Sequence, residues 1–201
     1  LAQLKAIPTS HILAALGLTV LSYLVMTSYD RLAISYISHP LHAGKVTLAS
    51  FISYAFSNTI GLSLLTSASI RYRLYTAWGL SAEEIARLVA FTTLTFWLGI
   101  VTVAGVVFIA EPTTMPVLGQ LAMHTVRPVG LVFVMVVFLY ILAVSLRKKP
   151  FVFRNWELRL PSVRLAGAQL LVGSIDWTLA GCVLFVLLPE PWTLPVHNRS
   201  Q

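Results

Sequence analysis

Charged residues are scarce in this 201-residue sequence, and their scarcity decides the class of protein. Asp, Glu, Lys and Arg make up 10% of the chain, whereas 57% of the residues are hydrophobic and the mean hydropathy is +0.83. A soluble domain carries about 25% charged residues. This chain lacks the polar side chains that would cover a water-facing surface, so we expect a protein embedded in a membrane.

Cysteine and the common catalytic motifs are also lacking. The single cysteine, Cys182, excludes an intrachain disulfide and a multi-cysteine zinc site. There is no glycine-rich phosphate loop, no nucleophile elbow and no HExxH motif. His39 and His42 flank Pro40, which disfavours a helical metal-binding pair. We therefore expect no metal, no cofactor and no catalysis by this chain.

Long apolar runs predict the fold. Five segments, roughly 11–29, 46–66, 86–110, 126–146 and 163–188, approach or exceed the length of about 20 helical residues that crosses a bilayer. Ser81 and Glu84 form a capping box, so the third helix should begin near Ala82. The sequence predicts an all-α polytopic membrane protein, with residues 1–201 forming one transmembrane domain.

The basic residues predict an orientation. The net charge of +7 is spread between the apolar runs and forms no single stripe, so we expect contacts with anionic lipids and no bound nucleic acid. With five crossings, ten Lys and Arg residues fall on the N-terminal side and four on the other. Because cytoplasmic loops are richer in Lys and Arg, this count predicts a cytoplasmic N-terminus in a bacterial inner membrane. The four on the other side are Arg31, Lys45, Arg127 and Arg199.

Asp176 is the most informative residue, because it lies near the middle of the last apolar segment. A carboxylate at that depth is costly and rarely faces lipid. We expect it to face the bundle interior or a wet cavity, with Gly173 and Ala180 leaving room beside it. It either pairs within the bundle or forms a polar element of a substrate path.

The second apolar segment has small and polar residues at mid-depth. Ser53, Ser57 and Gly61 recur every four residues, and Asn58 lies among them. Two interpretations remain open: close helix packing supported by hydroxyl groups, or a helix broken around Asn58 to Gly61 whose backbone lines a cavity. A similar stripe, for which packing is expected, is formed by Thr95, Gly99 and Thr102.

Two arginines lie among aromatic residues between the second and third apolar segments. Arg71 shares a helix face with Tyr75 and Trp78, whereas Arg73 points elsewhere. A guanidinium group suits a phosphodiester, although a pair that only fixes topology is the alternative. We also expect Asp30 and Arg31 to form a local ion pair. For the basic connector 147–164 the preferred interpretation is a positive-inside loop with a few anchoring aromatic residues, and the alternatives are a short hairpin or an amphipathic strip.

The stretch from Ala49 to Gly99 resembles the membrane domain of the bacterial lysylphosphatidylglycerol synthases, also called phosphatidylglycerol lysyltransferases or multiple peptide resistance factors. The likeness is carried by three motifs and extends more loosely over residues 12–188. These motifs are Arg71-Tyr72-Arg73-Leu74-Tyr75, Trp78-Gly79-Leu80-Ser81 and Asp176-Trp177.

The resemblance implies a function in lipid transport. In that family a membrane domain flips aminoacylated phosphatidylglycerol to the outer leaflet, which gives resistance to cationic antimicrobial peptides. A separate soluble domain transfers the amino acid from tRNA. By this resemblance we expect the chain to correspond to the first part of the flippase domain, without the later spans and without the soluble transferase domain. The expected protein partners are a soluble transferase domain or a second copy of the chain.

The predicted site combines the residues and the resemblance. Arg71 and Arg73 would recruit the lipid phosphate, and Asp176 would offset the charge of the ammonium groups beside the polar stripe that contains Asn58. Two alternatives are a proton-coupled solute transporter that uses Asp176, and a segment that docks or regulates a lipid aminoacyltransferase at the membrane.

Overall fold

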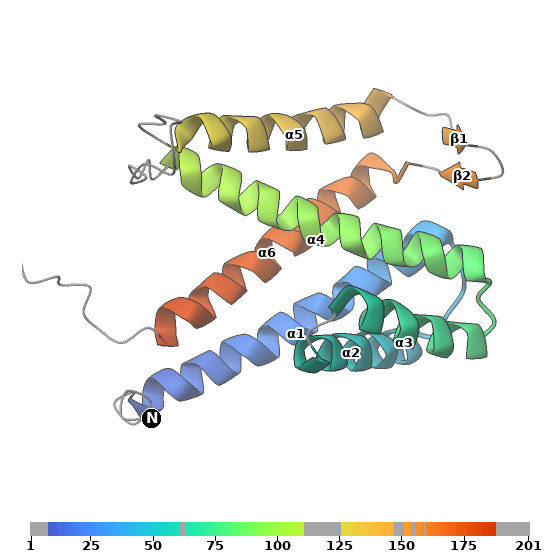
Figure 1. Cartoon of the computed structure of the whole chain (residues 1–201), viewed down its shortest axis with the longest axis horizontal. Helices are drawn as coiled ribbons and strands as arrows, with labels where there is room; N and C mark the ends of the chain where they lie inside the picture. Colours follow the sequence, from blue (N-terminus) through green and yellow to red (C-terminus); the bar gives the residue numbers. More distant parts are fainter. Residues whose placement is uncertain are drawn as a thin grey trace, which may run out of the picture.

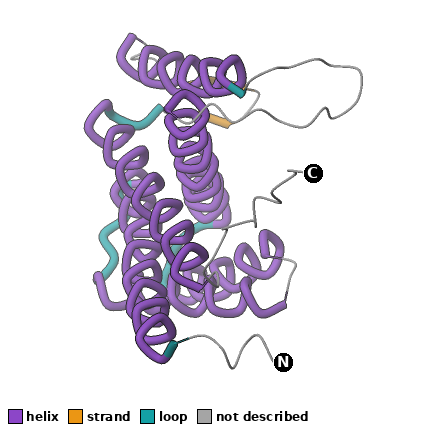
Figure 2. The backbone as a smooth tube through the Cα atoms, turned by 90° about the vertical axis from the view of Figure 1, so that its left-hand side faces the viewer, coloured by secondary structure: helices purple, strands orange, loops and turns teal. Residues whose placement is uncertain are grey.

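The computed structural model describes residues 8–60, 63–110, 126–146, 151–153, 156–158 and 160–187. These residues form six α-helices and two short strands, so the predicted all-α fold is confirmed (Figures 1 and 2). The helices are α1 (Thr9–Ile37), α2 (Ala43–Ile60), α3 (Ser63–Ala77), α4 (Ala82–Ala110), α5 (Arg127–Leu146) and α6 (Val163–Leu187). The strands are β1 (Phe151–Phe153) and β2 (Trp156–Leu158).

Four helices are long and apolar enough to cross a membrane: α1, α4, α5 and α6. They match four of the five predicted spans. A 29-residue helix such as α1 or α4 is about 43 Å long, which exceeds the apolar thickness of about 30 Å. These helices therefore cross at a tilt or project beyond the hydrocarbon.

The prediction of one membrane-crossing helix over 46–66 is wrong. The chain forms two shorter helices there, because α2 ends at Ile60 and α3 begins at Ser63. The helix is therefore interrupted close to the predicted break, whereas the expectation that the freed backbone lines a cavity stays a prediction. The two helices pack against each other as a helical hairpin. Its open ends lie together, with the Lys45 ammonium group 5.7 Å from the centre of the Trp78 ring.

The hairpin gives the bundle two distinct ends (Figure 1). At one end α1, α3 and α5 finish and α2, α4 and α6 begin, and the β1–β2 pair lies there. We call it the hairpin end. Strands β1 and β2 are antiparallel, with Phe151 opposite Leu158, so of the alternatives for this connector the short hairpin is the one found. The opposite end holds the start of α1, the end of α4, the start of α5 and the end of α6.

A tight turn joins α3 to α4. Gly79 has a φ of 93°, a backbone conformation that favours glycine. The predicted capping box then starts α4: the Ser81 backbone N–H donates to Glu84 at 2.8 Å, and the Glu84 N–H donates to the Ser81 hydroxyl at 3.2 Å. The start at Ala82 is as predicted.

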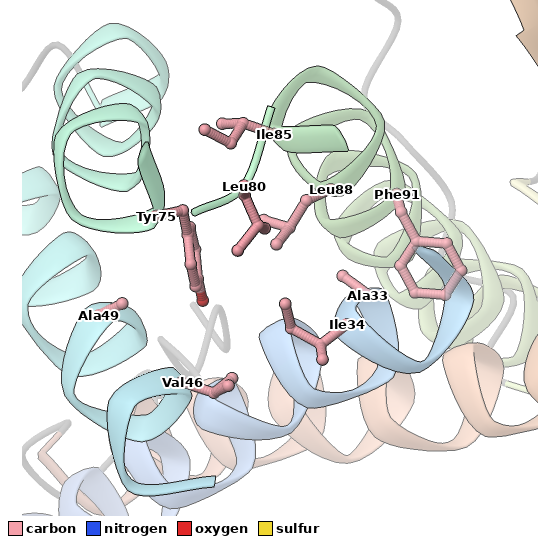
Figure 3. Close-up of a cluster of buried hydrophobic side chains, with 9 residues drawn as sticks. All are labelled: Ala33, Ile34, Val46, Ala49, Tyr75, Leu80, Ile85, Leu88 and Phe91. Atoms are coloured by element: carbon pink, nitrogen blue, oxygen red, sulfur yellow. The ribbon is translucent and has the colours of Figure 1, made fainter. Parts of the chain in front are cut away.

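The hydrophobic core lies near the hairpin end. Figure 3 shows its side chains converging from α1, α2, α3, the α3–α4 turn and α4. Tyr75 and Leu88 are fully buried in this cluster. The core therefore holds the α2–α3 hairpin against α1 and α4. Its members are Ala33, Ile34, Val46, Ala49, Tyr75, Leu80, Ile85, Leu88 and Phe91.

Helices α4 and α6 cross at a pair of glycines. A β-carbon added at Gly99 would lie 2.5 Å from the backbone of Gly173, so only glycine allows this approach. This confirms the expected packing role of the stripe that contains Gly99. Because Gly173 is about one turn before Asp176, the crossing also fixes the position of the acid.

Candidate functional site

A buried ion pair joins α1 to α3. The guanidinium group of Arg71 donates to Asp30, with its Nη2 2.9 Å from Oδ1 and its Nε 3.2 Å from Oδ2. Arg71 is 3% exposed and Asp30 is fully buried. The Tyr75 hydroxyl donates to the same carboxylate at 3.1 Å. The fork geometry of arginine and the extra donor together satisfy a charge that would otherwise be costly inside the membrane.

The predicted ion pair between Asp30 and Arg31 is wrong. Neighbouring residues point about 100° apart around a helix, so these two side chains leave α1 on different faces. Arg31 donates instead to the Thr47 hydroxyl of α2 at 3.0 Å. Asp30 turns inward to meet Arg71.

Arg71 is an interior residue. Its guanidinium group lies 4.7 Å from the centre of the Tyr54 ring and also donates to Ser67. The sequence placed it against Tyr75 or Trp78 on its own helix, whereas the ring that it covers belongs to α2. From the end of α3 at Ala77, Arg71 lies about 9 Å into the bundle.

Asp176 faces inward, as predicted. Its side chain is 5% exposed and accepts two hydrogen bonds from α1, from Ser22 at 2.9 Å and from the Tyr29 hydroxyl at 3.0 Å. Among the residues that the structure describes, no cation pairs with it. It lies about 20 Å along α6 from Val163, which is close to the middle of the helix.

Tyr29 and Tyr54 bring the two acids into one polar network. Their rings meet edge to face with centres 6.3 Å apart. The network runs from Asp176 through Tyr29 and Tyr54 to the Arg71–Asp30 pair. It links α1, α2, α3 and α6 and extends from mid-depth towards the hairpin end.

A cavity of about 340 Å³ adjoins this network. Such a volume lies in the lower part of the range for ligand pockets, about 300–1,000 Å³. Arg71 is its charged wall, while Phe96 and Trp97 of α4 are part of its apolar wall. The polar lining residues are Tyr54, Ser57, Ser67, Arg71, Thr92 and Thr93. This cavity, here called the interior cavity, can offer hydroxyl groups and a guanidinium face to an anionic or polar group.

Two grooves lie on the outside of the bundle. The α3/α4 groove has a volume of about 990 Å³ and contains the exposed Arg73. The α1/α2 groove has a volume of about 720 Å³ and contains Arg31. The structure thus separates the two arginines that the sequence treated as a pair, because Arg71 lines the interior cavity and Arg73 lines an outer groove. The side chain of Asn58 lies outside the described residues.

A second buried polar cluster joins α4, α5 and α6. The amide nitrogen of Gln169 donates to Thr95 at 2.8 Å, and the Tyr140 hydroxyl donates to the Gln169 amide oxygen at 2.6 Å. Gln169 is fully buried. Sequence reasoning missed Gln169, Tyr29 and Tyr54, although polar side chains inside apolar spans are the general signal for such sites.

The two histidines have separate partners. A ring nitrogen of His39 lies 3.0 Å from a carboxylate oxygen of Glu84 at the start of α4. The His42 ring accepts the backbone N–H of Gly44 at 3.2 Å. Both contacts lie at the hairpin end, where they join connectors to helices.

Comparison with known proteins supports the membrane assignment. No protein-family profile matches the chain. It is 36% identical over 189 residues to the Synechocystis protein called "Uncharacterized protein slr0712", a match that covers 94% of this chain and 59% of that protein. It is 34% identical over 180 residues to the inner membrane protein YbhN of Escherichia coli, covering 89% of this chain and 56% of YbhN.

The fold, the buried polar network and these relatives define a class. The chain is a multi-pass, all-α integral membrane protein. It spans somewhat more than half the length of the curated relatives that it matches. The likeness to lysylphosphatidylglycerol synthases stays a prediction.

Proposed function

We propose that the chain forms part of a flippase in the inner membrane, which moves aminoacylated phosphatidylglycerol to the outer leaflet. The observation that carries the proposal is Asp176, a buried acid at mid-depth whose partners among the described residues are neutral hydroxyl groups. The inner-membrane location is supported by the similarity to YbhN. The substrate class comes from the resemblance at Arg71-Tyr72-Arg73-Leu74-Tyr75 and Asp176-Trp177.

The charges of the lipid match the charges of the site. A lysyl-phosphatidylglycerol headgroup has one phosphodiester and two ammonium groups, so it carries a net positive charge. The interior cavity offers the remaining N–H groups of Arg71 and several hydroxyl groups to the phosphate. Asp176 offers a negative charge to the ammonium groups while the acyl chains stay in lipid.

A partner for the headgroup charge has a large effect on the rate. An unpartnered charge near the bilayer centre costs about 3 kcal/mol on insertion scales, which corresponds to roughly a hundredfold in rate. Moving lysyl-lipid outward replaces anionic lipid on the outer surface, so cationic antimicrobial peptides would bind the cell less strongly. The aminoacylated lipid would come from a soluble transferase domain or partner.

We propose the opposite orientation from the one that the sequence suggested, because the α2–α3 hairpin changes the count of basic residues at each end. The count of ten against four treated 46–66 as one crossing, but α2 and α3 return the chain to the same end. By sequence position, eleven of the fourteen basic residues then belong to the hairpin end and three to the opposite end. Those three are Lys5, Arg127 and Arg199. We therefore propose a cytoplasmic hairpin end and an N-terminus on the outer side.

This orientation is tested with reporter fusions. Alkaline phosphatase, which is active outside the cytoplasm, should be active when inserted after Glu111 or at the start of the chain. Green fluorescent protein, which folds in the cytoplasm, should fluoresce when inserted between Asn155 and Trp156. The opposite pattern at all three positions would restore the cytoplasmic N-terminus.

The flippase proposal is tested with Asp176→Asn in the full-length protein. We expect outer-leaflet lysyl-phosphatidylglycerol to fall by one to two orders of magnitude at equal protein level. Cys182→Ser, an exposed change on the same helix, is the matched control and should leave exposure unchanged. Equal outer-leaflet lipid in the wild type and Asp176→Asn would refute the role of Asp176.

A proton-coupled solute transporter is the second candidate, because a buried acid with two hydroxyl partners can carry a proton. It predicts uptake of a soluble compound driven by a pH gradient and independent of lipid headgroup. Proteoliposomes with and without a pH gradient separate the two functions. The flippase proposal predicts that labelled lysyl-phosphatidylglycerol moves between the leaflets. The transporter predicts proton flux when the soluble compound is added, without any need for this lipid.

A further inference from the structure

The α3/α4 groove and the interior cavity share a wall. Val89, Thr93 and Trp97, all on α4, line both spaces. The α1/α2 groove shares no lining residue with the cavity. One of the two outer grooves is therefore separated from Arg71 by a single row of side chains.

The α3/α4 groove has a charged end and an apolar floor. Arg73 lies about 6 Å from the end of α3, near the depth of lipid headgroups. It is exposed, and no described residue forms a hydrogen bond or ion pair with it. Ile85, Ala90 and Leu94 lie along the floor, and Trp97 lies about 22 Å along α4 from its start. The groove thus runs from headgroup depth towards the middle of the bilayer.

We propose that the α3/α4 groove is the lateral access site for a phospholipid from the leaflet at the hairpin end. The phosphate binds Arg73, an acyl chain lies along the floor on α4, and the headgroup passes Thr93 and Trp97 to reach Arg71 in the interior cavity. The occupant is a phospholipid because the groove combines the exposed cation of Arg73, which has no partner among the described residues, with an apolar floor. This proposal deepens the flippase function and rests on it for the transport step.

Thr93 is the residue best placed to control passage. It is half-buried and lines both the groove that contains Arg73 and the cavity that contains Arg71. A small hydroxyl side chain leaves room and offers a hydrogen bond to a passing headgroup. A large side chain at this position would close the wall without changing either arginine.

Binding is tested by photo-crosslinking the full-length protein in vesicles of phosphatidylcholine with phosphatidylglycerol that carries a diazirine on one acyl chain. We expect crosslinks on the α4 peptide 82–97, and Arg73→Gln should reduce them about tenfold through loss of the charged hydrogen bonds. Arg31→Gln, in the α1/α2 groove, is the matched control and should leave these crosslinks unchanged. Equal labelling of this peptide in wild type and Arg73→Gln would overturn the site.

Passage is tested separately with Thr93→Phe and Thr93→Val. Thr93→Phe should keep the α4 crosslinks and reduce lysyl-phosphatidylglycerol flipping at least tenfold, whereas Thr93→Val, which keeps the size, should retain most of the flipping. Unchanged flipping in Thr93→Phe would overturn the access route. If wild-type protein flips no lipid yet shows Arg73-dependent crosslinks, the flippase function fails while the groove stands as a lipid site.

Discussion

The glycine crossing of α4 and α6 gives the sharpest quantitative prediction. In Gly99→Ala, the new methyl carbon would lie 2.5 Å from both the carbonyl carbon and oxygen of Gly173 and 2.7 Å from its Cα. Non-bonded carbon atoms approach to about 3.5–4.0 Å, so the two helices must separate by about 1 Å. Overpacking of this kind costs about 1–3 kcal/mol. We expect Gly99→Ala to destabilise the protein by that amount, reduced by the better helix propensity of alanine.

Other glycines supply the control. A β-carbon at Gly167 or Gly181, both on α6, would have no heavy atom within 4 Å. Alanine there keeps the contacts and gains helix propensity of up to about 1 kcal/mol, so these variants should melt at or above the wild-type temperature. Gly173→Ala should behave like Gly99→Ala, because its β-carbon would lie 2.7 Å from the Thr95 carbonyl oxygen.

The assay is thermal unfolding of the purified protein in one detergent, followed by the loss of the monodisperse peak in size-exclusion chromatography. Alanine at the crossing glycines should lower the melting temperature, whereas alanine at Gly167 or Gly181 should leave it unchanged or raise it. A melting temperature of Gly99→Ala equal to or higher than that of Gly181→Ala would refute the close crossing. Because the crossing positions Asp176, Gly99→Ala should also reduce flipping in the lipid-exposure assay.

Two further predictions concern the buried ion pair and the α4 cap. Asp30→Asn and Arg71→Gln should each destabilise by about 3–5 kcal/mol because each leaves a buried charge unpaired, and the double variant should lose much less than their sum in the same melting assay. Glu84→Ala should cost about 1 kcal/mol by removing the partner of Ser81, whereas Glu83→Ala, which loses a surface pair with Arg87, should cost less than half of that.

The boundaries of α4, α5 and α6 could be predicted because they depend on local signals, whereas α1 ends at Ile37, eight residues beyond the predicted end of the first segment. The capping box fixed the start of α4 at Ala82, and the continuous apolar runs gave α5 and α6 to within one residue at each end. The inward direction of Asp176 was also predictable, since a carboxylate at mid-depth has few other places to go. These features follow from composition and spacing within one segment.

The α2–α3 hairpin was missed because hydropathy is averaged over a window of residues, and a short interruption hardly changes the average. The segment 46–66 is apolar enough to pass as a span, and its small polar residues are compatible with both close helix packing and a break, so the sequence alone does not choose between them. The error affects more than one helix. Because the hairpin replaces one crossing with two reversals, every later connector lies on the opposite side, relative to the N-terminus, from the side that the sequence predicted. Combining the sequence with the hairpin gives a stronger charge asymmetry than the sequence alone.

The partners of the charged residues could not be predicted, since they lie far apart in the chain. Asp30 and Arg71 are 41 residues apart, and Asp176 accepts from hydroxyl groups about 150 residues earlier. From the local pattern, Arg31 is the expected partner of Asp30, and Tyr75 is an expected neighbour of Arg71. In the folded protein Asp30 pairs with Arg71 in place of Arg31, and the Arg71 guanidinium group also lies over the Tyr54 ring. Long-range pairing of this kind depends on how four helices cross.

The contrast between the two buried acids indicates which of them is available to a ligand. Asp30 is held by a guanidinium group and a hydroxyl group, and a cationic ligand would have to displace Arg71 to reach it. Asp176 has two neutral donors, which orient the carboxylate but leave its charge uncompensated among the described residues. A carboxylate in that position gains most from binding a proton or a cation. The pair at Asp30 therefore stabilises the fold around the interior cavity, and of the two acids Asp176 is the one to which the flippase proposal gives a role in transport.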